Sequence, residues 1–221
     1  MWWLPLAIFA HVAPSPDADN RYVKVTLLPG HARIAYLVFL GERPGTLARA
    51  RMDTDGDGLL SDAEARVFGQ ALLGEVAPRV AVTLDGAAPA AAWSVSDVGL
   101  GTPTTSGGAF SVDLVLSLPY TPGRAEHTLT VADGWRPPQA GEAELRIETG
   151  PEVSLIFAHR ADAGRGVQTV YADPLGGPLD VRVAFRAPVV PVEQGARWPY
   201  LAGAILLAGL AVTLLVRQWK L

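Results

Sequence analysis

The most regular feature of the sequence is the alternation of apolar and polar residues in short segments. Glycine, proline or aspartate separates these segments, which is typical of strands that bury one face and expose the other. The segments lie at residues 21–28, 33–40, 80–84, 110–118, 128–131, 143–147, 153–157, 167–171 and 181–185. Short strands at this spacing predict a mainly β fold, an antiparallel β-sandwich that opens with a hairpin turning at residues 29–31.

One part of the chain, between the second and third predicted strands, departs from this pattern. Residues 41–45 break the alternation, and Thr46 is a candidate cap for a short helix that runs through Arg51. Residues 61–76 then carry apolar side chains at helical spacing, which predicts a second helix before Pro78. Its expected buried stripe consists of Val67, Phe68, Ala71, Leu72 and Val76. The sequence therefore predicts a helix-loop-helix insertion in the sandwich.

The loop between the two predicted helices, residues 53–64, reads Asp-Thr-Asp-Gly-Asp-Gly-Leu-Leu-Ser-Asp-Ala-Glu. It matches the calcium-loop pattern D-x-[DN]-x-[DN]-G-x5-E at every constrained position. Gly58 permits the sharp turn in the middle of the loop, and Glu64 can bind an ion through both carboxylate oxygens. The predicted calcium ligands are Asp53, Asp55, Asp57, the backbone carbonyl of Leu59, Ser61 and Glu64.

This loop resembles the EF-hand family, and the resemblance covers only the loop and its flanks. It implies calcium as the cofactor, whereas the alternative interpretation is an acidic loop of Asx turns without a metal. The sequence contains no second loop of this kind. A solitary loop in the presence of abundant calcium suits a structural role better than the role of a sensor. Calcium sites with dissociation constants of about 10⁻⁴–10⁻³ M suffice for extracellular modules.

The two ends of the chain carry apolar segments that suggest a place at a membrane. Residues 1–10 fit a secretory signal peptide, the alternatives being an apolar strand or an uncleaved anchor. Residues 199–216 contain no charge and are long enough to cross a bilayer as a helix, the alternative being a buried core helix. Basic residues follow this segment, which predicts a cytoplasmic tail at 217–221. The intervening parts are an extracytoplasmic domain at 11–186 and a proline-containing linker at 187–198.

Composition and charge exclude several classes of protein. The formal net charge of −4 argues against nucleic-acid binding, which requires a basic face. The absence of cysteine from the sequence excludes disulfides, thiolate catalysis and cysteine-ligated zinc.

No pattern in the sequence favours an enzyme. The segment 99–108 is rich in glycine but lacks the Lys-Ser/Thr pair of a phosphate-binding loop, so its glycines predict a mobile surface loop. His159 and Asp162 could pair but are more typical of a solvated turn, and His127 is a lone histidine. Paired acidic residues such as Glu142 and Glu144 are explained by the polar face of a strand. We therefore expect no enzymatic activity.

A second resemblance concerns the order Ala10-His11, Asn20-Arg21-Tyr22, a strand pair and an acidic glycine loop. It is similar to the extracytoplasmic N-terminal region of some bacterial nickel/cobalt transporters, over roughly residues 10–85. This chain has one predicted span rather than a permease, so the resemblance implies at most an accessory domain beside a transporter. If cleavage follows Ala10, the terminal amine and imidazole of His11 form half of a second metal site, which His31 could complete.

Two functions follow from these features. The first is a membrane-anchored, extracytoplasmic, calcium-binding β-domain that acts as a binding or assembly module, with a protein partner in the same membrane or in the periplasm. The alternative is a metal-handling accessory domain for a nickel/cobalt-type transporter. A hydrolase is a distant alternative. We expect the protein in the cytoplasmic membrane, with a single span, the N-terminal domain outside and the C-terminus inside.

Overall fold

The protein is described by a computed structural model, which covers residues 16–123, 126–158, 167–173 and 177–188, with the backbone alone for 167–173. These residues belong to one compact unit, Met1–Val189. The predicted signal peptide, the transmembrane helix with its tail, and all but the first two residues of the linker lie outside the described residues. Among the described residues, no helix is both long and apolar enough to cross a membrane.

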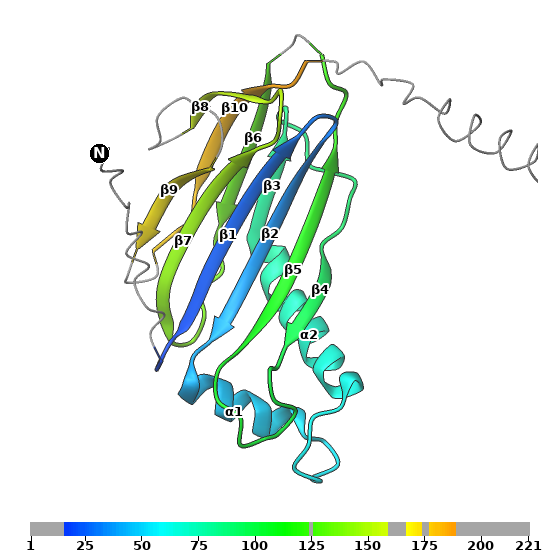
Figure 1. Cartoon of the computed structure of the whole chain (residues 1–221), viewed down its shortest axis with the longest axis vertical. Coiled ribbons are helices and arrows are strands. Elements are labelled where there is room, and N and C mark those ends of the chain that lie inside the picture. The colour runs from blue at the N-terminus through cyan, green and yellow to red at the C-terminus, as the bar shows by residue number, and fades with distance from the viewer. Residues whose placement is uncertain (1–15, 124–125, 159–166, 174–176, 189–221) are drawn as a thin grey trace, which may run out of the picture. The chain divides into compact units, whose positions relative to one another are not determined.

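The described part of the chain is mainly β and contains two sheets that lie one behind the other (Figure 1). Six strands form the first sheet in the order β4-β5-β2-β1-β7-β9, and four form the second in the order β3-β6-β10-β8. The first sheet comprises β1 (Asp19–Leu28), β2 (His31–Leu40), β4 (Ser94–Gly99), β5 (Phe110–Pro119), β7 (Ala140–Thr149) and β9 (Val167–Asp173). The second comprises β3 (Val80–Leu84), β6 (His127–Asp133), β8 (Ser154–Ala158) and β10 (Val181–Arg186).

The pairing corrects the prediction of a purely antiparallel sandwich, because β1 and β7 run parallel. The other strand pairs among the described residues are antiparallel. The chain leaves β6 in the second sheet and crosses to the first, where β7 enters beside β1 in the same direction. Alternation of apolar residues defines which face of a strand is buried but not the direction of its neighbour, so this pairing was not predictable from the pattern.

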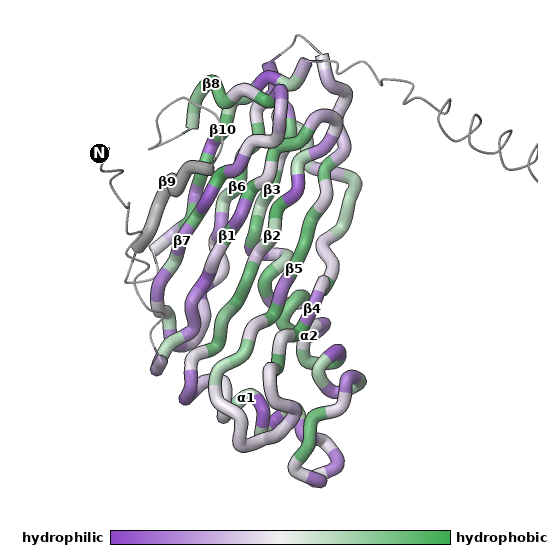
Figure 2. The backbone as a smooth tube through the Cα atoms, in the orientation of Figure 1, coloured by the Kyte–Doolittle hydropathy of each residue, from purple (hydrophilic) through white to green (hydrophobic). Residues whose placement is uncertain are grey.

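The core lies between the two sheets, where the alternating apolar residues meet. Along β2 every second residue is buried, and β5 and β6 show the same period of two. Figure 2 shows this alternation as hydrophobic and hydrophilic stretches along the strands. Ile34 and Val112 from the first sheet and Leu129 and Val183 from the second are completely buried in one apolar cluster. The strand segments predicted by periodicity are therefore confirmed.

The helical insertion follows β2, as predicted, but its first helix begins earlier than expected. Helix α1 (Glu42–Met52) starts after Gly41, and Thr46 lies inside it, where its hydroxyl donates to the Glu42 carbonyl at 2.8 Å. Proline is tolerated in the first turn because amides there need no helical partner, so Pro44 does not stop the helix. A β-carbon on Gly45 would lie 2.6 Å from the Gly108 carbonyl oxygen, so this glycine permits close packing rather than a break.

The second helix, α2 (Asp62–Val76), is followed by the short 3₁₀ helix η1 (Ala77–Arg79). Its predicted apolar stripe is wrong at Val67, which is 70% exposed. The stripe is also wrong at Ala71, which is exposed, but right at Val76, which is buried. The helix also buries Ala65 and Gly69, and it lies against β4. A β-carbon on Gly69 would lie 3.0 Å from the side chain of Val98, so the missing side chain allows the close approach.

A buried ion pair joins the two sheets. Arg21 of β1 donates to the carboxylate of Asp133, at the end of β6, and both side chains are completely buried. Arg21 also donates to the Trp135 carbonyl at 2.8 Å and to the Gly177 carbonyl at 2.7 Å. The hydroxyl of Tyr36 donates to the same Asp133 carboxylate at 3.2 Å. Asp133 thus connects the two sheets, and this role is a finding of the structure.

Replacing Arg21 with methionine should leave Asp133 buried without its cation, and we expect a loss of about 3–5 kcal/mol in the free energy of unfolding. The matched control is Lys24→Met on the same strand, where the pair with Glu148 (3.3 Å) is exposed and contributes at most about 1 kcal/mol. Urea denaturation of the full chain measures both. Equal losses in the two variants would contradict the proposed importance of the buried pair.

Candidate metal centre

The candidate metal centre is the acidic loop between α1 and α2, and the local sequence explains its position. Asp53 follows the last residue of α1, and its amide donates to the Arg49 carbonyl at 3.2 Å. Ser61 caps α2, where its hydroxyl accepts from the Glu64 amide at 3.3 Å. The Glu64 carboxylate in turn accepts from the Ser61 amide at 2.9 Å, which completes a capping box. Both ends of the loop are thus fixed by helix termini.

Three of the predicted ligands converge. Asp53, Asp55 and Asp57 each place one carboxylate oxygen within 4.8 Å of the other two. The Asp53 carboxylate accepts from the amides of Gly56 and Gly58, at 2.8 and 3.0 Å. Asp55 accepts from the Asp57 amide at 3.2 Å. The loop therefore winds tightly around its own carboxylates.

The two glycines of the loop allow this winding. Gly56 and Gly58 have φ angles of 74° and 81°, in the left-handed region where a side chain is strained. Nothing lies within 4 Å of a β-carbon built at either position, so the requirement for glycine is conformational and not steric. This agrees with the role that the sequence predicted for Gly58.

The remaining predicted ligands are not all turned toward the three aspartates. Glu64 lies outside that group, and its Oε1 accepts from the amide and hydroxyl of Thr54, at 2.7 and 2.9 Å. Its Oε2 accepts from the amide and hydroxyl of Ser61. The amide of Leu59 donates to Asp57 at 2.7 Å, and the Leu59 side chain is 53% exposed. Glu64 thus connects the two ends of the loop in this structure.

The hydrogen bonds to Glu64 favour its ionised form. The amide of Ser61, then that of Thr54, then the two hydroxyls lower the pKa of Glu64 from its usual 4.5 to about 2. The carboxylate is therefore negative throughout the physiological range, as a calcium ligand must be.

A second segment, residues 100–109, packs against the acidic loop. The Leu60 amide donates to the Pro103 carbonyl at 3.1 Å, and the Thr105 amide donates to the Gly58 carbonyl at 3.1 Å. Leu59 and Thr104 form an isolated antiparallel bridge between these two bonds. The second half of the acidic loop is thus held in an extended conformation by a distant part of the chain.

Arg49 of α1 fixes segment 100–109 in turn. Its side chain is 1% exposed and donates to five backbone carbonyls, those of Leu100, Thr102, Thr104, Gly108 and Ala109. Burial lowers the pKa of Arg49, which Glu42 opposes, but a guanidinium remains charged in proteins. A β-carbon on Gly107 would lie 2.7 Å from Arg49, so glycine makes room for the guanidinium.

This arrangement corrects the prediction that residues 99–108 form a mobile surface loop, and it shows what the sequence reasoning missed. Arg49 lies one turn after Gly45 and beside Ala48 on the inward face of α1, together with Met52. The sequence signal for a buried role of Arg49 was its position as a basic residue on an otherwise small and apolar helix face. Without knowledge of segment 100–109, it gave no indication of a partner.

The other candidate residues lie away from the acidic loop. His31 is half-buried at the start of β2, whereas His11, its predicted partner in a second metal site, lies outside the described residues. Within the described part of the chain, the three aspartates are the one group of three or more possible ligands that comes together. The second metal site stays a prediction.

Two further sequence interpretations have clear outcomes. His127 is a buried histidine whose Nδ1 lies 2.8 Å from the Asp85 carboxylate and whose ring packs on Tyr120, while its Nε2 has no hydrogen-bond partner among the described residues. Glu142 is not explained by the polar face of a strand, because it is 7% exposed and accepts from the Tyr22 hydroxyl at 3.0 Å. Glu144 accepts from Arg146 at 3.1 Å. His159 and Asp162 lie outside the described residues.

Comparison with known proteins gives no further assignment. No protein-family model matches the chain, and no curated protein sequence matches it either.

The low pKa of Glu64 predicts how the free energy of unfolding depends on pH in the absence of metal. Because the pKa is lowered on folding, its hydrogen bonds contribute to stability above about pH 4.5, and this contribution is lost as the pH falls toward about 2. In Glu64→Gln the free energy of unfolding should depend less on pH in this window. Urea denaturation of the full chain across it measures the difference, and parallel curves would contradict the prediction.

Arg49→Lys should loosen the contact between segment 100–109 and the acidic loop, because an ammonium cannot reach five carbonyls at once. We expect faster hydrogen exchange at the amides of Leu60 and Thr105, which cross the contact. The amide of Ala65, bonded within α2 to Ser61 at 3.0 Å, is the internal control. Unchanged exchange at Leu60 and Thr105 would show that the contact does not depend on the guanidinium.

Proposed function

We propose that residues 53–64 bind a calcium ion and that the protein is an extracytoplasmic, calcium-binding β-domain anchored in a membrane. The observation that supports this best is the convergence of the Asp53, Asp55 and Asp57 carboxylates within 4.8 Å. Hard carboxylate and carbonyl oxygens are the donor set that Ca²⁺ prefers. The three aspartates fit this ion directly.

The fourth carboxylate, that of Glu64, would complete the set. The side chain lies on the first turn of α2 and already reaches across the loop to Thr54 at its beginning. Ser61 and the carbonyl of Leu59 belong to the same proposed set. A bound ion would supply positive charge that offsets the mutual repulsion of these carboxylates. The proposed ligands come from both ends of the loop, so their convergence on an ion would tie the C-terminal end of α1 to the N-terminal end of α2.

A structural role suits this loop better than a signalling role. Segment 100–109 already pairs with the loop between Gly58 and Leu60, and Arg49 anchors that segment to α1. A loop that is held on one side by the body of the protein has little freedom to change shape when an ion binds. We therefore propose that calcium stabilises the helical insertion and the β-domain that carries it.

The anchoring part of the proposal rests on the sequence at the two ends of the chain. The apolar segment at 199–216 has the length and composition of a membrane-spanning helix, and residues 1–10 resemble a signal peptide. No pattern in the sequence favours an enzyme, so the proposal is a domain that binds another protein outside the membrane. We propose a binding or assembly role.

Calcium should raise the melting temperature of the full chain, and Glu64→Gln should abolish or strongly reduce this rise, because it removes the carboxylate that joins the loop ends. Asp62→Asn is the matched control, since Asp62 is exposed on the same helical turn and is not among the proposed ligands. Thermal unfolding at millimolar Ca²⁺, with Mg²⁺ for comparison, measures the effect. No shift in the wild-type protein refutes calcium binding, and equal behaviour of the two variants refutes the ligand assignment.

The proposed topology places the β-domain, residues 11–186, outside the cytoplasmic membrane and the C-terminus inside. Protease added to intact spheroplasts should therefore digest the β-domain and spare a C-terminal tag. Release of the whole protein by high salt would contradict a membrane span. A protected β-domain with a cleaved tag would indicate the opposite orientation.

A further inference from the structure

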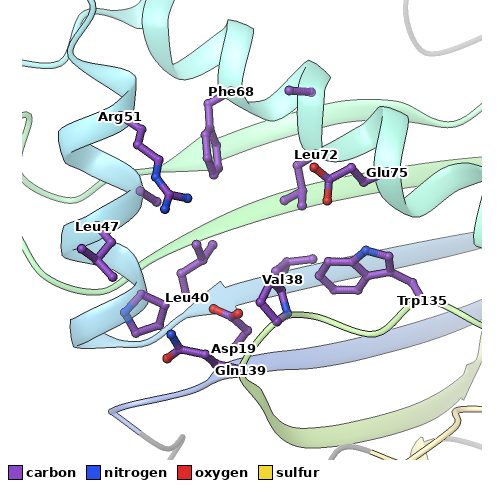
Figure 3. A pocket seen from close by; sticks show the side chains of 14 residues that line it. Asp19, Val38, Leu40, Leu47, Arg51, Phe68, Leu72, Glu75, Trp135 and Gln139 are labelled. Atoms are coloured by element: carbon purple, nitrogen blue, oxygen red, sulfur yellow. The ribbon is translucent and has the colours of Figure 1, made fainter.

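A pocket of about 270 Å³ lies between the two helices and the end of the first sheet. Leu47 and Arg51 come from α1, Phe68 and Leu72 from α2, and Leu40 from β2 (Figure 3). Trp135 closes it from the segment between β6 and β7, as the figure also shows. The walls are thus largely apolar and include two aromatic rings.

The floor of this pocket contains a buried carboxylate. Asp19, the first residue of β1, is 6% exposed, and Figure 3 shows its carboxylate pointing into the pocket beside Leu40. Its Oδ1 has no hydrogen-bond partner among the described residues. The backbone amide of Asp19 donates to the Gln139 carbonyl at 2.6 Å, which fixes the position of the residue.

A buried carboxylate oxygen without a partner is costly, because the desolvation of the charged form is not compensated. Burial raises the pKa of Asp19, and the backbone of Gln139 only partly opposes this effect. The side chain serves no ion pair within the described part of the chain, in contrast to Asp133, which pairs with Arg21. The pocket is therefore lined by a buried carboxylate, one oxygen of which lacks a hydrogen-bond donor.

The groups around the pocket limit the ligands that would fit. Glu75 of α2 adds a second carboxylate to the lining, and the Gln139 side chain adds an amide. Arg51 is the one basic residue among those that line the pocket. The combination of a buried acceptor, a second acid and aromatic walls selects for a positively charged donor attached to an apolar body.

We propose that this pocket binds a small organic cation, a primary ammonium carried on an apolar or aromatic body, whose N–H groups donate to Asp19. The apolar body lies against Phe68, Leu72 and Trp135. Two sources share this chemistry, a simple amine and the ammonium of an apolar amino acid, and in the second case Arg51 offers a partner for the ligand carboxylate. The site uses none of the proposed calcium ligands and does not rest on calcium binding.

Three compounds with the same phenylethyl body test this site by calorimetric titration of the full chain. Phenethylamine carries the ammonium, 2-phenylethanol replaces it with a neutral hydroxyl, and phenylalanine adds a carboxylate. We expect phenethylamine to bind at least about tenfold more tightly than 2-phenylethanol, since a charged hydrogen bond to a buried carboxylate is lost in the alcohol. Phenylalanine binding at least as tightly as the amine identifies an amino acid as the ligand class, and weaker binding identifies a simple amine.

Two variants place the binding in this pocket. Asp19→Asn keeps the shape of the side chain but removes its charge, so the preference for amine over alcohol should disappear. Leu47→Trp adds bulk at a position that is 54% exposed at the pocket and should weaken amine binding without disturbing the core. Val67→Trp is its matched control, because Val67 is 70% exposed on α2 and does not line this pocket.

The proposal is overturned if millimolar phenethylamine produces no binding, or if the alcohol binds as tightly as the amine. It is also overturned if the amine binds Leu47→Trp as tightly as Val67→Trp, because binding would then lie elsewhere. Should Asp19→Asn fail to fold, the comparison of the two tryptophan variants still decides the location, and the comparison of amine with alcohol decides the chemistry.

Discussion

The guanidinium of Arg49 is the interaction on which the helical insertion depends. A buried cation must be satisfied, and here it is satisfied by five backbone carbonyls of one segment and not by a carboxylate. Because these five carbonyls all point at the Arg49 side chain, segment 100–109 curls around it. The same segment then offers an amide and a carbonyl to the acidic loop, at Thr105 and Pro103. The acidic loop, the segment and α1 therefore form one connected unit.

The pair of Arg21 and Asp133 solves the same physical problem in a different way. It places one charge on each sheet, so the two sheets are joined by a charged hydrogen bond inside an apolar core. Tyr36 adds a donor to Asp133, and burial together with the Asp133 carboxylate raises the pKa of Tyr36, which keeps the hydroxyl protonated. A pair of this kind fixes the relative position of the sheets more than it adds stability, since the desolvation of both charges offsets much of their attraction.

The sequence predicted the local features well and the non-local ones poorly. The alternation in residues 33–40 and 110–118 and the helical spacing in 61–76 correspond to observed elements, because burial of one face imposes a period on each. The start of α1 was missed because Gly45 resembles a helix breaker, whereas its lack of a side chain admits the Gly108 backbone. The parallel pairing of β1 with β7 and the partners of Arg49 depend on segments far apart in sequence, which no local period encodes.

The candidate sites show the same contrast between local features, which the sequence predicted, and non-local features, which it did not. The spacing of Asp53, Asp55 and Asp57 was enough to predict their convergence, because the glycines between and after them allow a tight turn within a few residues. Asp19 precedes the alternating segment at 21–28, so the pattern gave no indication of its burial. Its burial results from α1, α2 and the segment around Gln139, which meet only in the folded chain.

The acidic loop and the pocket share two helices, and this has a thermodynamic consequence. The loop joins the C-terminal end of α1 to the N-terminal end of α2, while the pocket lies between Leu47 on α1 and Leu72 on α2. Any ligand that favours one spacing of these helices changes the affinity of the other site by the same factor in both directions. Segment 100–109 limits the size of this coupling, because Arg49 holds α1 to the edge of the sheet regardless of the ion. Two binding events at this end of the domain would therefore be coupled weakly, and the anchoring by Arg49 is the physical reason.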